Sequence, residues 1–240
     1  TKKVNIINFG KFKKEGTYKM SKNIDLILKD ILEEISVGKK DYLEMEKELN
    51  SFLKNLNLEI KRKNISAEVF VGGSFAKKTL IKKENYDADV FVRFDKKYKR
   101  DELSLILENI LKSVKEYTEG RLICLFGCGG NRDAAKRPKM AKAAAEYADM
   151  LIITSDNPRN ENPDEIIKEI VSGLEGYTIP YDIVTDRRQA VYHALEIAKS
   201  GDVIVLAGKG HEDYQILADN VHIHFDEREI VADGLKLLGR

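Results

Sequence analysis

The sequence lacks any apolar run that approaches the roughly 20 residues needed to cross a bilayer. Its N-terminal residues also lack the basic, then apolar, then small-residue order of a secretory signal peptide. These absences argue against the membrane-spanning and secreted classes, so we expect a cytoplasmic location and no membrane partner. The 240 residues suffice for one large or two small domains.

Cysteine is also scarce. The two cysteines, Cys124 and Cys128, lie four residues apart around a glycine-rich turn. A structural zinc site usually takes four nitrogen or sulfur ligands, and two at this spacing do not provide it. We therefore interpret them as one strand cysteine and one turn cysteine.

The four prolines all lie in the second half, and the charge is divided in the same way. Residues 1–120 hold 26 basic and 20 acidic side chains, whereas the remaining 120 hold 15 and 20. Such asymmetry indicates either a basic half that binds nucleic acid or two sequences of different origin. The first half is rich in Lys, Asn and Ile and the second in Ala, Gly and Arg, which favours different origins. We expect two domains, residues 1–120 and 121–240.

The first half predicts a small mixed α+β head. Apolar residues at helical spacing predict helices over residues 24–35, 42–56 and 102–117. Residues 68–71 and 87–94 have the pattern of strands, and the lysine-rich start contains either a flexible arm or a stray strand at 4–9. We expect this head to form its own sheet, separate from that of the second half.

The second half alternates strands with helices, so the fold class is α/β. Strands are predicted at residues 122–126, 150–154, 181–184 and 203–207, and a hairpin-like segment at 221–225. Helices follow over 138–147 and after three capping residues, Asn162, Asp186 and Asp226. This order predicts an open, mostly parallel, Rossmann-like α/β domain with helices on both faces.

Two aspartates suggest a first site. Asp87 and Asp89 are two residues apart on a predicted strand, so both carboxylates point to the same face. Such a pair suits Mg²⁺ held together with substrate phosphates. Upstream, Gly72, Gly73 and Ser74 offer backbone N–H groups and a hydroxyl to a phosphate.

These motifs resemble the catalytic head of the DNA polymerase β-like nucleotidyltransferases, most of all the archaeal-type tRNA CCA-adding enzymes. The resemblance covers residues 22–118 and rests on Val71-Gly-Gly-Ser-Phe-Ala-Lys-Lys-Thr-Leu80 followed by Asp87-Ala-Asp-Val-Phe-Val92. It implies that Gly73 and Ser74 bind the triphosphate and that Asp87 and Asp89 are catalytic metal ligands. It also implies Mg²⁺ as cofactor, ATP or CTP as substrate, and weak tRNA contact through the basic half.

That family also needs a third carboxylate on a later strand and tail domains that hold tRNA. The composition of this chain changes, near Gly120, before the positions where these would be expected. The head is therefore truncated by this comparison. An acidic residue of the second half, such as Asp133 or Asp156, is an open alternative for completing the metal pair.

A second site is predicted where loops follow the strands of the second half. The signals are Gly127-Cys-Gly-Gly-Asn-Arg-Asp133, Lys136-Arg-Pro138, Ser155-Asp-Asn-Pro-Arg159, Asp186-Arg187, and Ala207-Gly-Lys-Gly-His-Glu-Asp-Tyr214. Ligands of open α/β sheets bind at this edge. Arg132 and Arg159 can bind a carboxylate and Glu212 an ammonium, which together match a zwitterionic amino acid. Gly208-Lys209-Gly210 is not a P-loop, because the full motif is missing.

This joint pattern closely resembles the C-terminal domain of the Mur ligases, from about Arg121 onward. The Ser-Asp-Asn-Pro-Arg stretch resembles the version in ligases that add meso-diaminopimelate rather than lysine. The resemblance implies that Arg132, Asn157, Arg159, Gly208 and Glu212 hold the diaminopimelate. The ATP-binding and UDP-sugar-binding domains of that family have no counterpart in the sequence.

Three hypotheses follow. The chain is a chimera of two modules without complete activity, or a nucleotidyltransferase with an unusual C-terminal domain, or a binding module for a diaminopimelate-like ligand. The change of charge and composition near Gly120 favours the first, with the third as its remaining biochemistry.

Overall fold

The computed structural model describes residues 2–11, 36–72, 75, 85–94, 103–209 and 212–239. The predicted helix at 24–35, and Gly73, Ser74, Gly210 and His211, lie outside these residues. The strands are β1 (Lys2–Lys11), β2 (Ala67–Val71), β3 (Asn85–Phe94), β4 (Leu122–Phe126), β5 (Met150–Ile153), β6 (Tyr181–Ile183), β7 (Val203–Ala207), β8 (Tyr214–Ile216) and β9 (His222–His224). The main helices are α2 (Lys39–Arg62), α4 (Leu103–Lys115), α5 (Lys136–Ala145), α6 (Pro163–Val171), α7 (Arg187–Ile197) and α8 (Glu227–Leu237).

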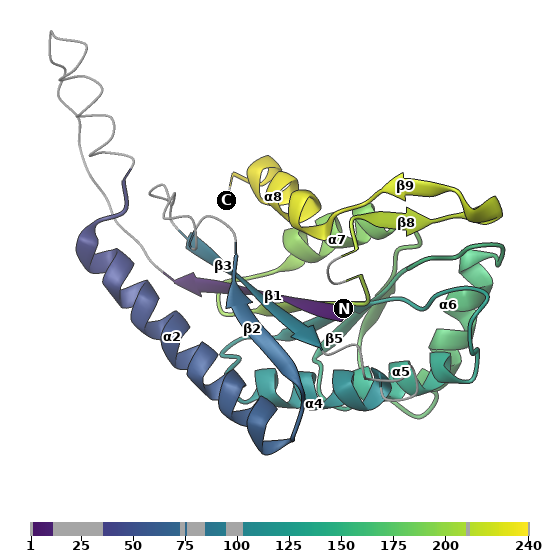
Figure 1. The fold of residues 1–240 in the computed structure, drawn as a ribbon, viewed down its shortest axis with the longest axis horizontal. Coiled ribbons are helices and arrows are strands. Elements are labelled where there is room, and N and C mark those ends of the chain that lie inside the picture. The colour runs from purple at the N-terminus through teal and green to yellow at the C-terminus, as the bar shows by residue number, and fades with distance from the viewer. Residues whose placement is uncertain are drawn as a thin grey trace, which may run out of the picture.

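Seven of these strands form one mixed sheet in the order β2-β3-β1-β7-β4-β5-β6 (Figure 1). The β7, β4, β5 and β6 strands are parallel, as predicted for the second half. β1, β2 and β3 pair antiparallel, and β1 also pairs antiparallel with β7.

The expectation of two separate sheets is therefore wrong. The ten-residue β1 strand pairs with β3 along one edge and with β7 along the other, from Val4 opposite Ala207 to Asn8 opposite Val203. The open edge of β7 offers unpaired backbone groups, and β1 satisfies them. The division into domains 1–120 and 121–240 stays a prediction.

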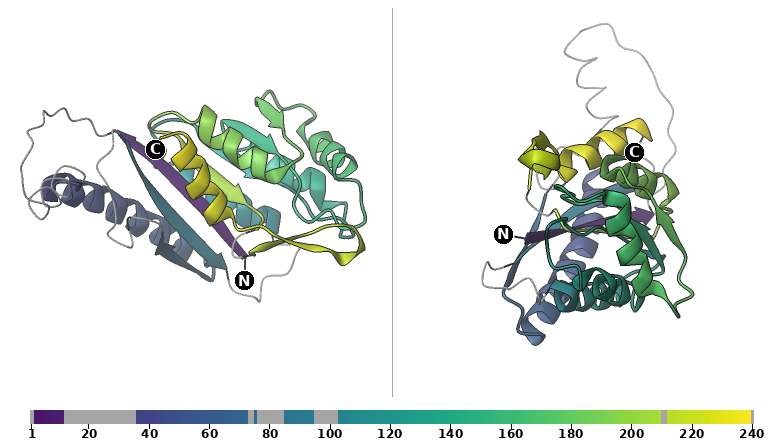
Figure 2. Two further views of the ribbon diagram at one scale, coloured as in Figure 1. Left: turned by 90° about the horizontal axis from the view of Figure 1, so that it is seen from above. Right: turned by 90° about the vertical axis from the view of Figure 1, so that its right-hand side faces the viewer.

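The two faces of the parallel strands pack against different helices. In β4, Leu122, Cys124 and Phe126 belong to one buried cluster, which α2, α4, α5 and α6 cover. Ile123 and Leu125 belong to a second cluster, with α7 and α8. This alternation explains why β4 and β7 are continuous apolar runs, since both of their faces are buried. Figure 2 shows α7 and α8 side by side above the sheet.

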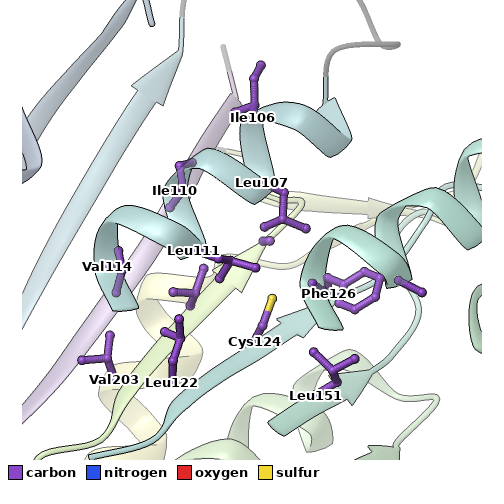
Figure 3. Close-up of a cluster of buried hydrophobic side chains, with 14 of the residues drawn as sticks. Ile106, Leu107, Ile110, Leu111, Val114, Leu122, Cys124, Phe126, Leu151 and Val203 are labelled. Carbon is purple, nitrogen blue, oxygen red and sulfur yellow. The ribbon is translucent and has the colours of Figure 1, made fainter. Parts of the chain in front are cut away.

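Helix α4 packs on the parallel strands although it precedes Gly120 in the chain. Its side chains Ile110, Leu111 and Val114 are almost fully buried, at no more than 2% exposure. Figure 3 shows Leu111 and Val114 on the side of the helix that faces Leu122 and Val203, residues of β4 and β7. This helix therefore completes the core of the second half as well as contacting α2.

The predicted helix starts are confirmed. The side chains of Asn162, Asp186 and Asp226 accept hydrogen bonds from the backbone N–H groups of Asp164, Gln189 and Arg228. Helix α5 begins two residues before Pro138, which its first turn tolerates because the N–H groups there have no intrahelical partner. No helix within the described ranges is long and apolar enough to cross a membrane.

Candidate functional site

A cavity of about 360 Å³ opens where β4, β5 and β7 end. It combines a polar side from the loops after these strands with an apolar side from α4 and α5. Its lining residues include Ile106, Leu107, Ile110, Cys128, Arg132, Asp133, Lys136, Arg137, Met140, Asp156, Asn157, Arg159, Gly208, Glu212 and Tyr214. Arg132, Asn157, Arg159, Gly208 and Glu212 are the five residues that the sequence predicts for substrate binding, and all five line this one cavity.

Two glycines let the loops after β4 and β5 touch. A Cβ atom at Gly127 would lie 2.3 Å from the carbonyl oxygen of Thr154, and one at Gly130 would lie 1.9 Å from that of Pro158. The Gly130 N–H donates to the carbonyl oxygen of Asn157 at 2.9 Å. A residue with a Cβ atom could not make these approaches, so the glycines at 127 and 130 allow the two loops to pack against each other.

Arg159 holds its own loop in place. Its backbone is in the left-handed region, with φ 52°, and its N–H donates to the Ile216 carbonyl oxygen at 3.2 Å. Its Nη1 donates to the carbonyl oxygens of Gly130 at 2.9 Å and Asn157 at 3.2 Å. The guanidinium is thereby fixed in the cavity wall that Arg132 also lines.

Asn157 and Glu212 are joined by a hydrogen bond across the loops after β5 and β7. The Asn157 Nδ2 donates to Glu212 Oε2 at 3.1 Å, and Asn157 Oδ1 accepts from the Ile216 N–H at 2.8 Å. Lys209 Nζ donates to the same Oδ1 atom. The sequence did not single out Lys209 as a site residue, because a lysine between glycines gives no signal of burial.

Arg187 lies behind the cavity and not in its lining. Its Nη1 donates to the Ser155 carbonyl oxygen at 3.2 Å and its Nη2 to that of Ala207 at 3.0 Å. Both carbonyls immediately precede cavity-lining loop residues. Arg187 therefore holds the loops after β5 and β7 in place through their backbone carbonyls. The side chain of Asp186 caps α7.

Arg137 is a second buried cation, at the start of α5. Its Nη2 donates to Glu161 Oε2 at 2.7 Å and its Nη1 to Glu169 Oε2 at 2.8 Å. Burial alone raises the pKa of Glu161, but the hydrogen bonds from Arg137 and from the Asn131 N–H outweigh it and lower that pKa. Glu161 is thus held as a carboxylate that links the loops after β4 and β5.

The apolar side of the cavity includes the thiol of Cys128. Burial, reinforced by the nearby Asp156 carboxylate, raises the pKa of Cys128 to about 12. Cys128 is therefore a neutral thiol at physiological pH, as the interpretation of a turn cysteine requires. Ile106, Ile110 and Met140 line the same cavity.

The first predicted site lies elsewhere in the sheet. Asp87 and Asp89 are on β3, opposite Phe9 and Ile7 of β1. In β1, Ile7 lies opposite Ile204, near the start of β7. The aspartates therefore lie toward the edge where β7 begins, whereas the cavity lies where it ends.

This placement speaks against the alternative that Asp133 or Asp156 completes the metal pair, because both line the cavity at the other edge. Strands β1 and β7 also stand between β3 and β4. Within the described residues, no group of three or more His, Cys, Asp or Glu side chains is placed to hold a metal ion.

Part of the chain is similar to a known protein family. The family model of the Mur ligase, glutamate ligase domain, matches residues 106–210. The match begins before Gly120, within α4, in agreement with the packing of that helix on β4 and β7. Residues 106–210 of this chain are therefore similar to a Mur ligase C-terminal domain.

Several curated proteins are similar over this part of the chain. The UDP-N-acetylmuramoyl-L-alanyl-D-glutamate–2,6-diaminopimelate ligase 1 of Clostridium acetobutylicum is 56% identical over 132 residues, which are 55% of this chain and 27% of the relative. The corresponding ligase of Synechocystis is 46% identical over 151 residues, 63% of this chain and 29% of the relative.

A solved structure of a ligase with this name superimposes with a TM-score of 0.53 at 37% sequence identity. The superposition covers 57% of this chain and 28% of that one. The chain thus spans a little over a quarter of the length of the relatives it matches. These similarities do not show a nucleotidyltransferase head or a chimera.

Proposed function

We propose, from the similarity of residues 106–210 to the Mur ligase, glutamate ligase domain, that this chain binds meso-diaminopimelate as the amino-acid-binding part of a peptidoglycan-building ligase. The observation that carries the proposal is the convergence of Arg132, Arg159, Asn157 and Glu212 on one cavity. The similar curated ligases have 2,6-diaminopimelate in their names, which supports this amino acid as the ligand.

The chemistry of the cavity fits one end of this ligand. The guanidinium groups of Arg132 and Arg159 bind a carboxylate through charge-assisted hydrogen bonds, and Glu212 binds an ammonium. Lysine carries the distal ammonium but lacks the distal carboxylate, so it cannot accept these charge-assisted hydrogen bonds from the two arginines. The cavity is therefore expected to prefer meso-diaminopimelate.

ATP and Mg²⁺ would serve the ligation step of such an enzyme. Among the described residues no group of three or more His, Cys, Asp or Glu side chains is placed to hold a metal ion. The part that we propose for this chain is to bind and orient the amino acid. We expect the affinity of the 240-residue chain for the amino acid to be modest, because an open site does not hold its binding groups in place as well as a closed one.

Calorimetric titration of meso-diaminopimelate and of lysine into the 240-residue chain tests the proposal. The native chain should prefer meso-diaminopimelate. Arg159→Ala should remove most of this preference, since one charge-assisted contact is worth about 1.5–3 kcal/mol, or roughly tenfold to hundredfold in Kd. Lys168→Met is the control, since it removes an exposed positive charge on α6 outside the cavity lining. Equal affinities in the native chain, or no binding at millimolar ligand by a folded chain, contradict the proposal.

The nucleotidyltransferase interpretation of residues 22–118 is the second candidate. It rests on Asp87 and Asp89 alternating along β3, and it takes Mg²⁺ with ATP or CTP and a weak tRNA contact. We expect weak Mg²⁺-nucleotide binding and no nucleotide incorporation. Radiolabelled CTP added to a tRNA without its CCA end, with Asp87→Ala as control, measures this, and incorporation that the substitution abolishes would establish the activity.

A further inference from the structure

We propose that Lys209 is a specificity-determining residue, whose buried ammonium makes the cavity accept a zwitterionic head group in preference to a bare cation. The inference rests on the proposed function, because it assumes that the cavity binds an amino-acid end. It adds Lys209, which lies within one of the sequence motifs but is neither one of the five predicted substrate-binding residues nor part of the cavity lining.

The Lys209 side chain is fully buried, at 0% exposure, and is surrounded by polar groups of four residues, which belong to the loop after β5, the loop after β7 and the first position of β8. Its Nζ donates to the Tyr214 carbonyl oxygen at 3.0 Å and to Asn157 Oδ1. The same atom lies 3.3 Å from Asp156 Oδ1 and 3.4 Å from Glu212 Oε2. A buried ammonium is tolerated only with such compensation, so its charge is part of the site.

The charges of this cluster leave one negative charge for a ligand. Asp156 and Glu212 carry two carboxylates, and Lys209 neutralises one of them. One ligand ammonium then balances the cluster, and Arg132 and Arg159 line the same cavity as cations that suit a ligand carboxylate. Without Lys209 the cluster would carry two negative charges, which would attract the isolated ammonium of lysine more strongly.

Lys209 also orients the Asn157 amide. The Asn157 Oδ1 atom accepts from two donors, Lys209 Nζ and the Ile216 N–H, so this atom must be the oxygen. The Nδ2 group then faces Glu212 Oε2 at 3.1 Å. Glu212 Oε2 thereby accepts hydrogen bonds from two donors, Asn157 Nδ2 and Lys209 Nζ. The remaining hydrogen-bond acceptor capacity of the Glu212 carboxylate is directed to the ligand.

The test compares Lys209→Met and Lys209→Arg with the native chain in calorimetric titrations of meso-diaminopimelate and lysine. Methionine keeps a similar length and an apolar stem without the charge, and arginine keeps the charge. Lys168→Met, an exposed charge on α6, controls for the general effect of losing one positive charge. Thermal unfolding of each variant establishes that the chain tested is folded.

We expect Lys209→Met to bind lysine about threefold or more tightly and to reduce the preference for meso-diaminopimelate about tenfold. A merely structural lysine would give weaker binding of both ligands, so a gain in lysine affinity is the distinguishing result. Lys209→Arg, or Lys168→Met, should keep the native preference.

The outcomes separate this inference from the proposed function. A native chain that discriminates, with Lys209→Met discriminating equally or losing both ligands in parallel, overturns the inference alone. If Lys209→Arg is folded and behaves as Lys209→Met does, the charge is not the cause and the inference is overturned. A native chain that binds neither amino acid overturns the proposed function, and the inference with it.

Discussion

The side chains of Arg187 and Glu227 form an ion pair that is buried on both sides, with 0% and 1% exposure. Nη2 and Nε of Arg187 lie 2.7 and 2.9 Å from the same Glu227 Oε1 atom. These residues begin α7 and α8, and Arg187 also contacts the carbonyls that precede the cavity loops after β5 and β7. One buried pair thus joins two helix starts to two loops of the site.

Removing one partner of this pair should be costly. Arg187→Met leaves Glu227 buried without its cation, and we expect a loss of about 3–5 kcal/mol in the free energy of unfolding. The double variant Arg187→Met, Glu227→Leu should recover part of that loss, because no charge remains unpaired. Urea denaturation of both variants measures the difference, and a double variant that is less stable than Arg187→Met would contradict this account.

The ionisation of the Asp202 carboxyl makes the free energy of unfolding depend on pH in acid. Burial raises its pKa, but hydrogen bonds from Arg121 and from the Lys199 N–H outweigh burial and lower it below the usual value of about 3.9. A depressed folded-state pKa stabilises the fold above the unfolded pKa, and the stabilisation is lost as pH falls through the folded pKa.

Asp202→Asn should therefore lower the free energy of unfolding by about 1.5–3 kcal/mol at pH 7, with the difference shrinking below pH 4. Urea denaturation between pH 7 and pH 2 measures this. The exposed Asp233→Asn on α8 is the control and should change stability little at any pH. A difference between Asp202→Asn and the native chain that stays constant down to pH 2 would show that the charge is not responsible.

Gly130 connects stability to binding. Gly130→Ala places a methyl group against the Pro158 carbonyl, which is backbone and must move together with Arg159. We expect a loss of about 1–3 kcal/mol and weaker binding of meso-diaminopimelate. Gly176→Ala is the matched control, since φ is 86° there but no atom lies within 4 Å. It should cost about 1–2 kcal/mol and leave the Kd unchanged. Calorimetry and thermal unfolding compare the two variants.

The two thiols should resist alkylation in the folded chain. Burial raises the pKa of both Cys124 and Cys128 to about 12, so very little thiolate is present at pH 8. Iodoacetamide should modify both at least about a hundredfold more slowly than in urea, and the Cys128 rate should still rise at pH 10. Mass spectrometry after timed quenching follows each site, and Cys128 labelled as fast as in urea would contradict its burial.

The sequence predicts the parallel half of the fold well because its signals are local. The strands at 122–126 and 203–207 agree with β4 and β7 to the residue, and the capping residues Asn162, Asp186 and Asp226 act as predicted. The five predicted substrate-binding residues line one cavity, because loops after parallel strands meet at one edge.

Other features depend on contacts far along the chain. The apolar stripe of α4 shows that the helix is buried, but not that it packs on β4 and β7 beyond Gly120. The pairing of β1 with β7 could not be predicted from the sequence, because the lysine-rich segment that forms β1 has no clear periodicity. The burial of Lys209 arises from two loops and the start of β8, which converge only in the folded chain, so its local sequence could not reveal it.

The position of β1 has a consequence for how the chain is made. Val4 lies opposite Ala207, so the two residues leave the ribosome roughly 200 residues apart, or about 10–40 s at ordinary rates of synthesis. During that interval β1 can pair with β3, while its other edge has no partner from its own chain. An unpaired edge invites pairing with another molecule. Nascent copies of this protein thus have a period of vulnerability to aggregation that ends only when β7 emerges and closes the sheet.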